Sequence, residues 1–292
     1  MKWGISLSGG GVPGIAAHLG FMETLSEHGL VPPVLVGTSA GGLVAGMLAA
    51  GADLHQLITA WQQIADDHWY LIPREVLHAA EVLRPSRTPG FLSLSEFVSA
   101  VWGKVFPWAN LTPEQLQQFA LQEQKRLQVS GWRADYGVVV ADLTVGKSLL
   151  LSNLSSTWPT LDALTATAAT PILFEGVRGP DNHLCCDGGL YDLDPVEVCI
   201  GRGAVKVISV HIGHQASVPN RLSIQTLASI VISRGLAATN SAANPVPPDL
   251  AIRIDTYGGL VAFDRFRDDL QLGVTTATAN LDKLRALVSD KP

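Results

Sequence analysis

The sequence predicts an α/β fold with three layers, in which helices cover both faces of a mostly parallel central sheet. Short apolar runs typical of strands alternate with longer helical patterns, and this βαβ alternation is typical of parallel sheets. The 292 residues are 47% hydrophobic and 16% charged, which provides enough apolar side chains for a large core. We therefore expect one domain over residues 1–292.

The individual elements follow from local patterns. Apolar runs predict strands at residues 3–8, 34–37, 137–141, 147–152, 205–211 and 250–254. Longer patterns predict helices at residues 14–28, 40–50, 53–66, 93–103, 112–128, 160–169, 221–237 and 263–288. The strands at 137–141 and 147–152 are joined by a short turn and predict a hairpin. Residues 66–135 are less regular and rich in tryptophan and proline, so we expect a helical elaboration over one end of the sheet.

Charge and cysteine content exclude several classes of function. The formal net charge of -6 and the lack of a Lys/Arg cluster argue against a nucleic-acid partner. The three cysteines, Cys185, Cys186 and Cys199, are too unevenly placed for a disulfide framework or a zinc site. We expect packed thiols, and no metal or other cofactor. The chain shows neither a signal peptide nor an apolar run suited to a membrane span, which predicts a cytoplasmic location.

The most informative stretch is Gly37-Thr38-Ser39-Ala40-Gly41, a Gly-x-Ser-x-Gly pattern. An apolar run precedes it and a small-residue helical run follows it, which is the context of a nucleophilic serine. The flanking Gly37 and Gly41 leave room for a strained turn, and the helix N-terminus brings N–H groups and partial positive charge to the hydroxyl. We predict Ser39 as a nucleophile, against the alternative of a Gly/Ser turn without chemistry.

A second motif, Gly9-Gly10-Gly11-Val12-Pro13-Gly14, lies between the first strand and the first helix. It fits the dinucleotide pattern Gly-x-Gly-x-x-Gly, but that function needs an acidic residue at the end of the second strand, where this chain has Ser39. Consecutive glycines also let backbone N–H groups point at an anion. We therefore predict an oxyanion hole at Gly9, Gly10 and Gly11, with the last two as its main donors and Gly14 as support.

A third motif is Asp187-Gly188-Gly189, directly after the apolar run 184–186. A carboxylate at a strand end followed by two glycines can reach into a site without shielding. Alone the pattern is weak, because Asp-Gly is also common in turns.

In this order and at this spacing, the three motifs resemble the patatin-like phospholipase family over most of the chain. The segments 141–146 and 166–174 add secondary similarities. The resemblance implies hydrolysis of lipid acyl esters by a Ser–Asp dyad, with Ser39 as nucleophile and Asp187 as base. It implies a lipid or acyl-ester substrate and is compatible with peripheral membrane contact, to which exposed tryptophans of residues 66–135 could contribute.

The chain departs from the family pattern at two positions. The family usually carries a basic residue where this chain has Pro13, so a role for that side chain at a phosphate headgroup is in doubt. Pro13 itself is compatible with the first turn of a helix. At Asp194-Pro195 the family more often has Asn-Pro, and we expect a structural role for Asp194.

Three other functions compete with the dyad hydrolase. An α/β-hydrolase triad could use His211 or His214, which follow Asp187 in the chain, although such enzymes place several strands before their serine. A catalytically idle lipid-binding protein of the same fold would not require the intact serine, aspartate and glycine loop. An acyltransferase would share every one of these residues and differ only in the acceptor of the acyl group.

Overall fold

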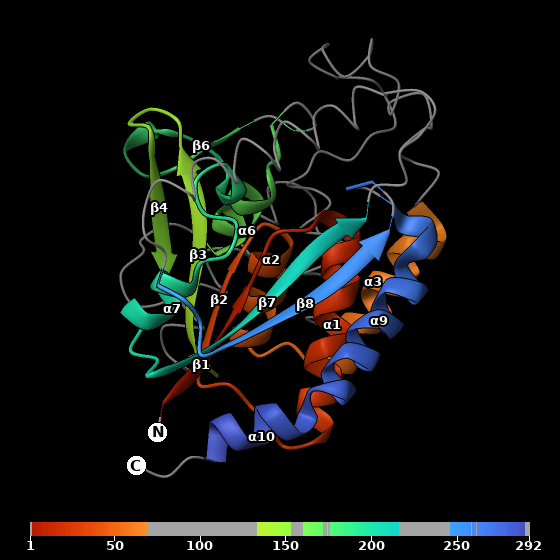
Figure 1. Cartoon of the computed structure of the whole chain (residues 1–292). Coiled ribbons are helices and arrows are strands. Elements are labelled where there is room, and N and C mark those ends of the chain that lie inside the picture. The colour runs from red at the N-terminus through yellow and green to blue at the C-terminus, as the bar shows by residue number, and fades with distance from the viewer. Residues whose placement is uncertain are drawn as a thin grey trace.

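The computed structural model describes residues 2–68, 133–152, 160–171, 174, 176–215, 246–257, 259–260 and 262–289 (Figure 1). At its centre lies an eight-stranded sheet in the order β5-β6-β3-β2-β1-β7-β8, with β4 paired to β3. The strands are β1 (Trp3–Leu7), β2 (Val34–Thr38), β3 (Asp135–Asp142), β4 (Lys147–Ser152), β5 (Val177–Arg178), β6 (Leu184–Asp187), β7 (Lys206–Gln215) and β8 (Leu250–Tyr257).

The sheet is mixed but mostly parallel. Strands β3, β2, β1, β7 and β8 run parallel to one another, whereas β4 and β6 are antiparallel to β3, and β5 is antiparallel to β6. The predicted α/β class and the predicted hairpin of β3 and β4 are therefore confirmed.

Helices flank both faces of the sheet, unevenly in the described part of the chain (Figure 1). One side carries α1 (Gly11–Glu27), α2 (Ala40–Ala49), α3 (Leu54–His68), α6 (Thr160–Ala168) and α9 (Phe266–Ala279). The other face carries the short α7 (Val196–Gly201), which packs on β1, β2 and β7. The chain continues from α9 into α10 (Leu281–Ser289), and three single-turn 3₁₀ segments cover Pro180–Asn182, Gly188–Leu190 and Phe263–Arg265.

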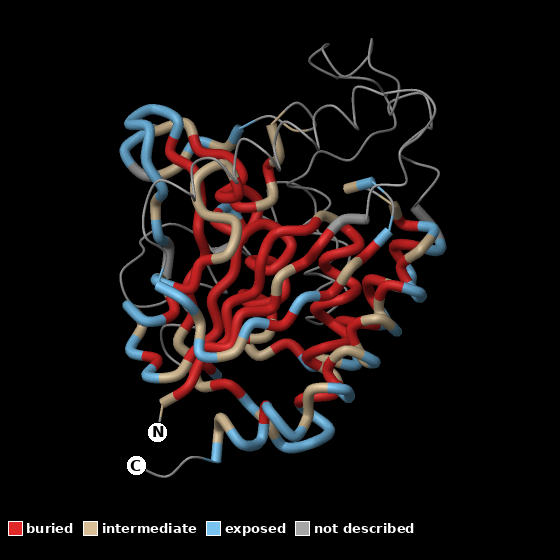
Figure 2. Tube along the Cα trace, viewed as in Figure 1, coloured by how far each residue is buried: buried red, intermediate tan, exposed pale blue. Residues whose placement is uncertain are grey.

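The core follows this division because strand residues alternate between the two faces. Leu35 of β2 belongs to the large core under α1 and α2, whereas its neighbours Val34 and Val36 pack against α7 with Cys199. Figure 2 shows the central strands and the inner helices as continuously buried. The inner strands β1 and β2 are thus buried along their whole length, as strands covered on both faces are, whereas the edge strand β8 has alternating burial.

The ends of β2 and β6 meet on one edge of β3, and this brings Ser39 and Asp187 together. Val139 of β3 pairs with Thr38 of β2, and the next residue, Val140, pairs with Asp187 of β6. Both β3 residues also pair with β4, so β2 and β6 must share the opposite edge. Because β2 is parallel and β6 antiparallel to β3, their carboxyl ends face each other.

Several boundaries differ from the sequence prediction. The single helix expected at 263–288 is divided into a 3₁₀ turn, α9 and α10, because Asn280 ends α9 and its side-chain amide donates to Thr276 O. The strand expected to end at Asp187 is β6, whereas the short elements β5 and α7 were not predicted. Helices expected at 93–103, 112–128 and 221–237, and nearly all of the elaboration expected at 66–135, lie outside the described residues.

Within the described ranges, no helix combines the length and the apolarity that crossing a membrane requires.

Candidate active site

Ser39 occupies a strained backbone conformation between β2 and α2. Its φ of 53° and ψ of -121° lie outside the regions that non-glycine residues usually adopt. The predicted glycines explain how the turn closes: a Cβ on Gly37 would lie 2.3 Å from backbone atoms of Gly41, and one on Gly41 would lie 2.2 Å from Leu7 O. The motif therefore forms the sharp strand–turn–helix elbow expected from the sequence.

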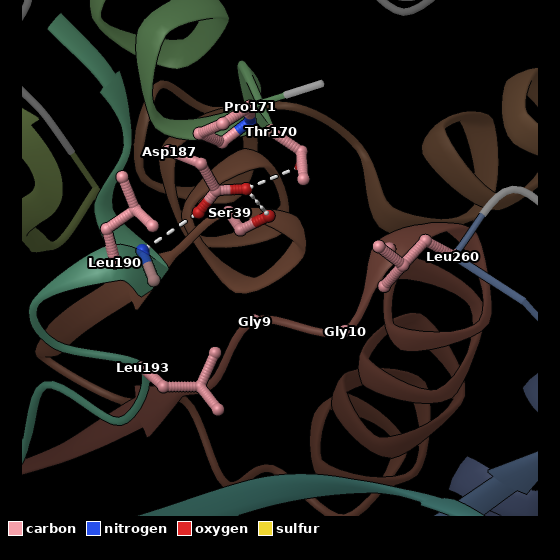
Figure 3. A pocket seen from close by; sticks show the side chains of 11 residues that line it. Gly9, Gly10, Ser39, Thr170, Pro171, Asp187, Leu190, Leu193 and Leu260 are labelled. Atoms are coloured by element: carbon pink, nitrogen blue, oxygen red, sulfur yellow. Dashed lines mark hydrogen bonds between the residues drawn. The ribbon is translucent and has the colours of Figure 1, made fainter. Parts of the chain in front are cut away.

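The Ser39 hydroxyl donates a hydrogen bond to Asp187, as Figure 3 shows. Its Oγ lies 2.8 Å from Oδ2 of the carboxylate. The other oxygen, Oδ1, accepts from the Gly189 N–H at 2.8 Å. Gly188 passes so close to β3 that a Cβ there would lie 2.2 Å from Val139 O. All three residues of the third motif thus take part in placing the carboxylate.

Burial changes the acidity of the Asp187 carboxyl. Asp187 is only 6% exposed, and loss of solvation raises the pKa of its carboxyl above the usual range. Hydrogen bonds from Gly189, Thr170 and Ser39 oppose this rise in pKa, because they favour the charged form. The raised pKa makes this aspartate a stronger base than one in water.

Two threonines near the end of α6 contact the same site, and the sequence analysis does not name them as site residues. The Thr167 hydroxyl donates to Val139 O at 2.6 Å and accepts from the Ser39 N–H at 2.9 Å. The Thr170 hydroxyl donates to Oδ2 of Asp187 at 2.8 Å. Both lie in the segment 166–174 that contributed to the family resemblance, which was the only available signal.

The glycine loop lies beside the elbow, but it does not offer all three predicted donors. The Gly9 N–H donates to Leu193 O at 3.1 Å, so the prediction of Gly9 as an oxyanion donor is wrong. The N–H groups of Gly10 and Gly11 have no hydrogen-bond partner among the described residues. Gly11 has φ of +60°, and a Cβ there would lie 2.2 Å from Leu260 O, so this position requires glycine.

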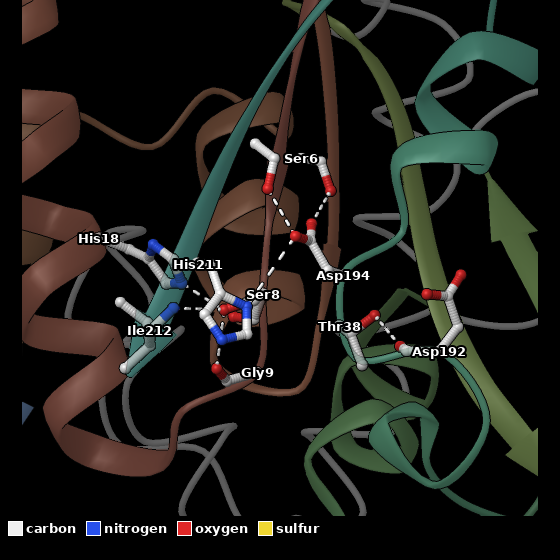
Figure 4. A network of polar contacts seen from close by, with 10 residues as sticks. Ser6, Ser8, Gly9, His18, Thr38, Asp192, Asp194, His211 and Ile212 are labelled. Atoms are coloured by element: carbon white, nitrogen blue, oxygen red, sulfur yellow. Dashed lines mark hydrogen bonds and ion pairs between the residues drawn. The ribbon is translucent and has the colours of Figure 1, made fainter. Parts of the chain in front are cut away.

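A buried network fixes the start of this loop (Figure 4). The Ser8 Oγ accepts from the Ile212 N–H at 2.8 Å and donates to Gly9 O at 3.0 Å. His18 of α1 is fully buried, and its Nε2 lies 2.8 Å from Ser8 O, so Nε2 must carry the proton that it donates. Burial lowers the pKa of His18 to about 4, which keeps the ring neutral near neutral pH.

The helix that follows the loop begins as predicted in type but earlier in position. Helix α1 starts at Gly11, and the Gly14 N–H donates to Gly10 O at 3.0 Å. Pro13 is buried within the first turn, where its missing N–H costs no hydrogen bond.

The glycine loop, Ser39 and Asp187 line one pocket. Its remaining wall is largely apolar and contains Pro171, Leu190, Leu193 and Leu260 (Figure 3). A serine hydroxyl, a carboxylate, free backbone N–H groups and an apolar wall are the components required for attack on an ester with a hydrocarbon chain.

His211, one of the two histidines of the competing triad, does not line this pocket. No histidine is among the described residues that line it. The Nδ1 of His211 lies 3.9 Å from Oδ2 of Asp194 (Figure 4). Asp194 accepts hydrogen bonds from Ser6 on Oδ1 and from Ser209 on Oδ2. The structural role expected for Asp194 is confirmed, and the side chain of His214 lies outside the described residues.

Cys185, Cys186 and Cys199 are free and buried, as expected for packed thiols. Burial raises the pKa of all three thiols, to about 11 or 12, which keeps them unreactive. Within the part of the chain that the structure describes, no group of three or more His, Cys, Asp or Glu residues could hold a metal ion.

Comparison with known families agrees with this geometry. The family model described as Patatin-like phospholipase matches residues 5–200, which is more than half of the chain. The chain belongs to the patatin-like phospholipase family. The matched segment of this patatin-like chain runs from β1 into α7 and contains the glycine loop, the serine elbow and Asp187.

Relatives of this patatin-like chain are more distant. It is 26% identical over 243 residues to uncharacterized NTE family proteins of Mycobacterium bovis and Mycobacterium tuberculosis, a match that covers 81% of this chain. The chain spans 56% of the length of these curated relatives.

Solved structures are similar only at a low level. VipD from Legionella pneumophila aligns over 95% of this chain and 67% of its own, with 12% identity and a TM-score of 0.49. Human GIVD cytosolic phospholipase A2 in complex with methyl gamma-linolenyl fluorophosphonate aligns over 98% of this chain and 58% of its own, with 12% identity and a TM-score of 0.46. Likenesses at this level carry no argument about activity.

Proposed function

We propose that this chain is a serine acyl-ester hydrolase that acts on lipids, with Ser39 as nucleophile and Asp187 as its base. The observation that carries the proposal is the 2.8 Å hydrogen bond from Ser39 Oγ to Asp187 Oδ2, made from a strained elbow at a helix N-terminus. Membership of the patatin-like phospholipase family supports a lipid acyl hydrolase.

In the first half-reaction, Ser39 Oγ attacks the ester carbonyl carbon while its proton passes to Oδ2 of Asp187. The negative charge that develops on the carbonyl oxygen is stabilised by the N–H groups of Gly10 and Gly11, with the Ala40 N–H as a further donor. Collapse of this intermediate breaks the bond to the leaving alcohol, which takes the proton from Asp187. The acyl group remains as an ester of Ser39.

In the second half-reaction, Asp187 accepts a proton from water, which attacks the acyl-serine. Cleavage of that ester returns the proton to Ser39 Oγ and releases a fatty acid. The same carboxylate therefore serves each step, alternating between base and acid. Its raised pKa supports both roles, because a carboxyl that is neither too weak a base nor too weak an acid transfers protons in both directions.

The apolar wall of the pocket supports a substrate with an acyl chain. Leu190, Leu193 and Leu260 surround the reacting groups, and burial of hydrocarbon against such a wall gains about 0.8 kcal/mol per methylene. No basic side chain is among the pocket-lining residues in the described part of the chain, which agrees with the absence of the usual basic residue at Pro13. We therefore infer that the acyl chain contributes more to recognition than a charged headgroup does.

Turnover on a panel of esters tests the proposal. The panel contains a phospholipid, a lysophospholipid, a triacylglycerol and p-nitrophenyl esters of increasing acyl length. We expect release of fatty acid from at least one lipid, kcat/KM that rises with acyl length, and no turnover by Ser39→Ala. Retained turnover in Ser39→Ala would overturn the proposed nucleophile.

A lack of turnover on every member of the panel, in folded wild-type protein, would favour the lipid-binding alternative. Appearance of a new ester in the presence of a second alcohol, in place of free acid, would identify the acyltransferase.

A further inference from the structure

The carboxylate of Asp187, the base of the proposed dyad, accepts a hydrogen bond from a second hydroxyl group, which has no role in the proposed reaction. Oδ2 of Asp187, the oxygen that faces Ser39, also accepts from Thr170 Oγ1 at 2.8 Å (Figure 3). The second acceptor of the Thr170 hydroxyl in the described structure is Ala168 O, at 3.5 Å. A charged acceptor at the shorter distance is much preferred, so the Thr170 hydrogen points at the carboxylate.

We propose that Thr170 is a positioning residue for the base: its hydroxyl holds Oδ2 of Asp187 against the Ser39 hydroxyl. This inference rests on the proposed function, because it assigns a role within the Ser39–Asp187 dyad.

The three hydrogen bonds to Asp187 fix the orientation of its carboxylate. Gly189 N–H holds Oδ1 at 2.8 Å, and Thr170 holds Oδ2 at the same distance. Rotation about the bond between Cβ and Cγ would break both contacts. The oxygen presented to Ser39 is therefore always Oδ2, without help from substrate.

Thr170 also determines where the transferred proton lies. A carboxylate oxygen has two lone pairs, and on Oδ2 the Thr170 hydrogen occupies one while the Ser39 hydrogen occupies the other. When the Ser39 proton moves to Oδ2, the bond from Thr170 remains in place. The proton then stays on the side of Ser39, where the leaving alcohol forms, and one proton is moved without loss of the Thr170 contact.

The chain placement of Thr170 suits this role. It follows α6, whose Thr167 holds the backbone of Ser39, and the Asp187 N–H donates to the adjacent Ala169 O at 3.0 Å. The same segment therefore binds the nucleophile's main chain and both the main chain and the side chain of the base. Thr170 itself lines the pocket.

The pH profile of catalysis distinguishes this role from simple packing. Thr170→Val keeps the shape of the side chain and removes the hydroxyl. Loss of one hydrogen bond to a charged group should raise the pKa of Asp187 by about one unit, so the acid limb of kcat/KM moves up by about one pH unit. At the plateau, kcat should fall on the order of ten-fold, with little change in KM, because the carboxylate is no longer held.

Two variants control for folding and for the loss of a threonine. Thr170→Ser restores the hydroxyl and should return the acid limb to its wild-type position. Thr165→Val removes a hydroxyl that donates to Leu161 O, in a residue of the preceding helix α6 that is 5% exposed, and should not move the acid limb. If Thr170→Val does not fold, Thr170→Ala replaces it with the same expected shift.

The outcomes separate this inference from the proposed function. If Ser39→Ala is inactive and the acid limb of folded Thr170→Val coincides with that of Thr165→Val, Thr170 does not position the base, although the dyad stands. If Ser39→Ala retains turnover, the proposed function itself is wrong. A limb that shifts in Thr170→Val and returns in Thr170→Ser supports the positioning role.

Discussion

The buried Asp187 and the half-buried Asp194 each accept hydrogen bonds from two hydroxyl groups, yet only Asp187 lines a candidate active site. Asp187 accepts from Ser39 and Thr170, both on Oδ2. Asp194 accepts from Ser6 on Oδ1 at 2.9 Å and from Ser209 on Oδ2 at 2.5 Å. A Ser–Asp hydrogen bond is therefore not sufficient to identify a nucleophile.

The backbone around each serine explains the difference. Ser6 and Ser209 are paired residues of the adjacent strands β1 and β7, and Asp194 joins them across the sheet face. Ser39 leaves the end of its strand with positive φ and lies at the N-terminus of α2, beside Gly10 and Gly11, whose N–H groups have no partner among the residues that the structure describes. Asp187 lies in an apolar pocket beside backbone N–H groups suited to an oxyanion, whereas Asp194 links two strands by hydrogen bonds to their serines.

The largest expected difference between the two sides is in covalent labelling. A fluorophosphonate probe should modify Ser39 and leave Ser6 and Ser209 unmodified, because both are buried strand residues. Peptide mass spectrometry of the labelled, folded protein measures this, with Ser39→Ala as the blank. Modification of Ser209 at a rate comparable to that of Ser39 would remove the distinction.

Next in size is the effect of neutralising each carboxylate. Asp187→Asn removes the base, and kcat should fall on the order of 10²–10⁴-fold with the fold intact. Asp194→Asn should leave kcat within a few-fold of wild type and lower the free energy of unfolding by about 1 kcal/mol, because one acceptor becomes a donor. Steady-state kinetics and urea unfolding of both variants make the comparison. Equal losses of kcat would contradict it.

A smaller loss of kcat is expected when the hydrogen bond that supports the proposed oxyanion donors near Asp187 is removed. His18→Phe removes the hydrogen bond to Ser8 O, so the Gly10–Gly11 segment is held less firmly and kcat should fall about ten-fold with KM unchanged. His28→Gln is the matched control, because His28 contacts Thr24 O at the far end of the same helix. An unchanged kcat in folded His18→Phe would show that the remaining contacts hold the loop.

The smallest effect concerns stability against pH. Burial raises the pKa of Asp187, so folding favours its neutral form. Ionisation of the carboxyl at higher pH therefore lowers the free energy of unfolding, and this penalty is absent at low pH, where the carboxyl is neutral in both states. Asp187→Asn should therefore raise the free energy of unfolding at pH 7 and leave it unchanged near pH 3, as measured by urea unfolding at both values. The site would then be a place where function is retained at the expense of stability.

Asp249 provides a control of opposite sign for this measurement. Although partial burial opposes the effect, hydrogen bonds from Lys206 and from the Val207 N–H lower the pKa of Asp249. Its contribution to stability is present at pH 7 and is lost as the pH falls, so Asp249→Asn should destabilise the protein at pH 7 and less so near pH 3. If Asp187→Asn and Asp249→Asn changed the free energy of unfolding at pH 7 in the same direction, this account of Asp187 would be contradicted.

Much of the site could be predicted because its parts are local. The elbow at Ser39 requires glycines at fixed neighbouring positions, and Asp187 is followed by glycines that let its backbone bend toward β3. Such requirements leave a pattern in consecutive residues. Gly10 and Gly11 were predicted as oxyanion donors for the same reason. The prediction of Gly9 as a donor was wrong, because its N–H donates to the carbonyl of Leu193, a residue distant in sequence.

The roles of the threonines could not be predicted, because the local sequence places them only in a segment similar to the family pattern and does not tell one hydroxyl from another. Thr165, Thr167 and Thr170 lie within six residues, and their hydroxyls bind a helix carbonyl, the elbow and the base respectively. Only the direction in which α6 ends relative to β3 and β6 distinguishes them. The division of α9 from α10 was missed in a similar way, since one asparagine ends a helix only where its amide reaches a free carbonyl.

The sequence by itself determined the α/β class, the family, and the residues Ser39 and Asp187 as candidates, because strand periodicity and glycine-dependent turns are properties of neighbouring residues. Tertiary structure alone decided that the two candidates meet and that Asp194 links β1 and β7 through hydrogen bonds from Ser6 and Ser209. That meeting depends on β2 and β6 ending head to head on one edge of β3, where Val139 and Val140 align them. Register between strands that are far apart in the chain is set by packing of the whole sheet, so no short pattern records it.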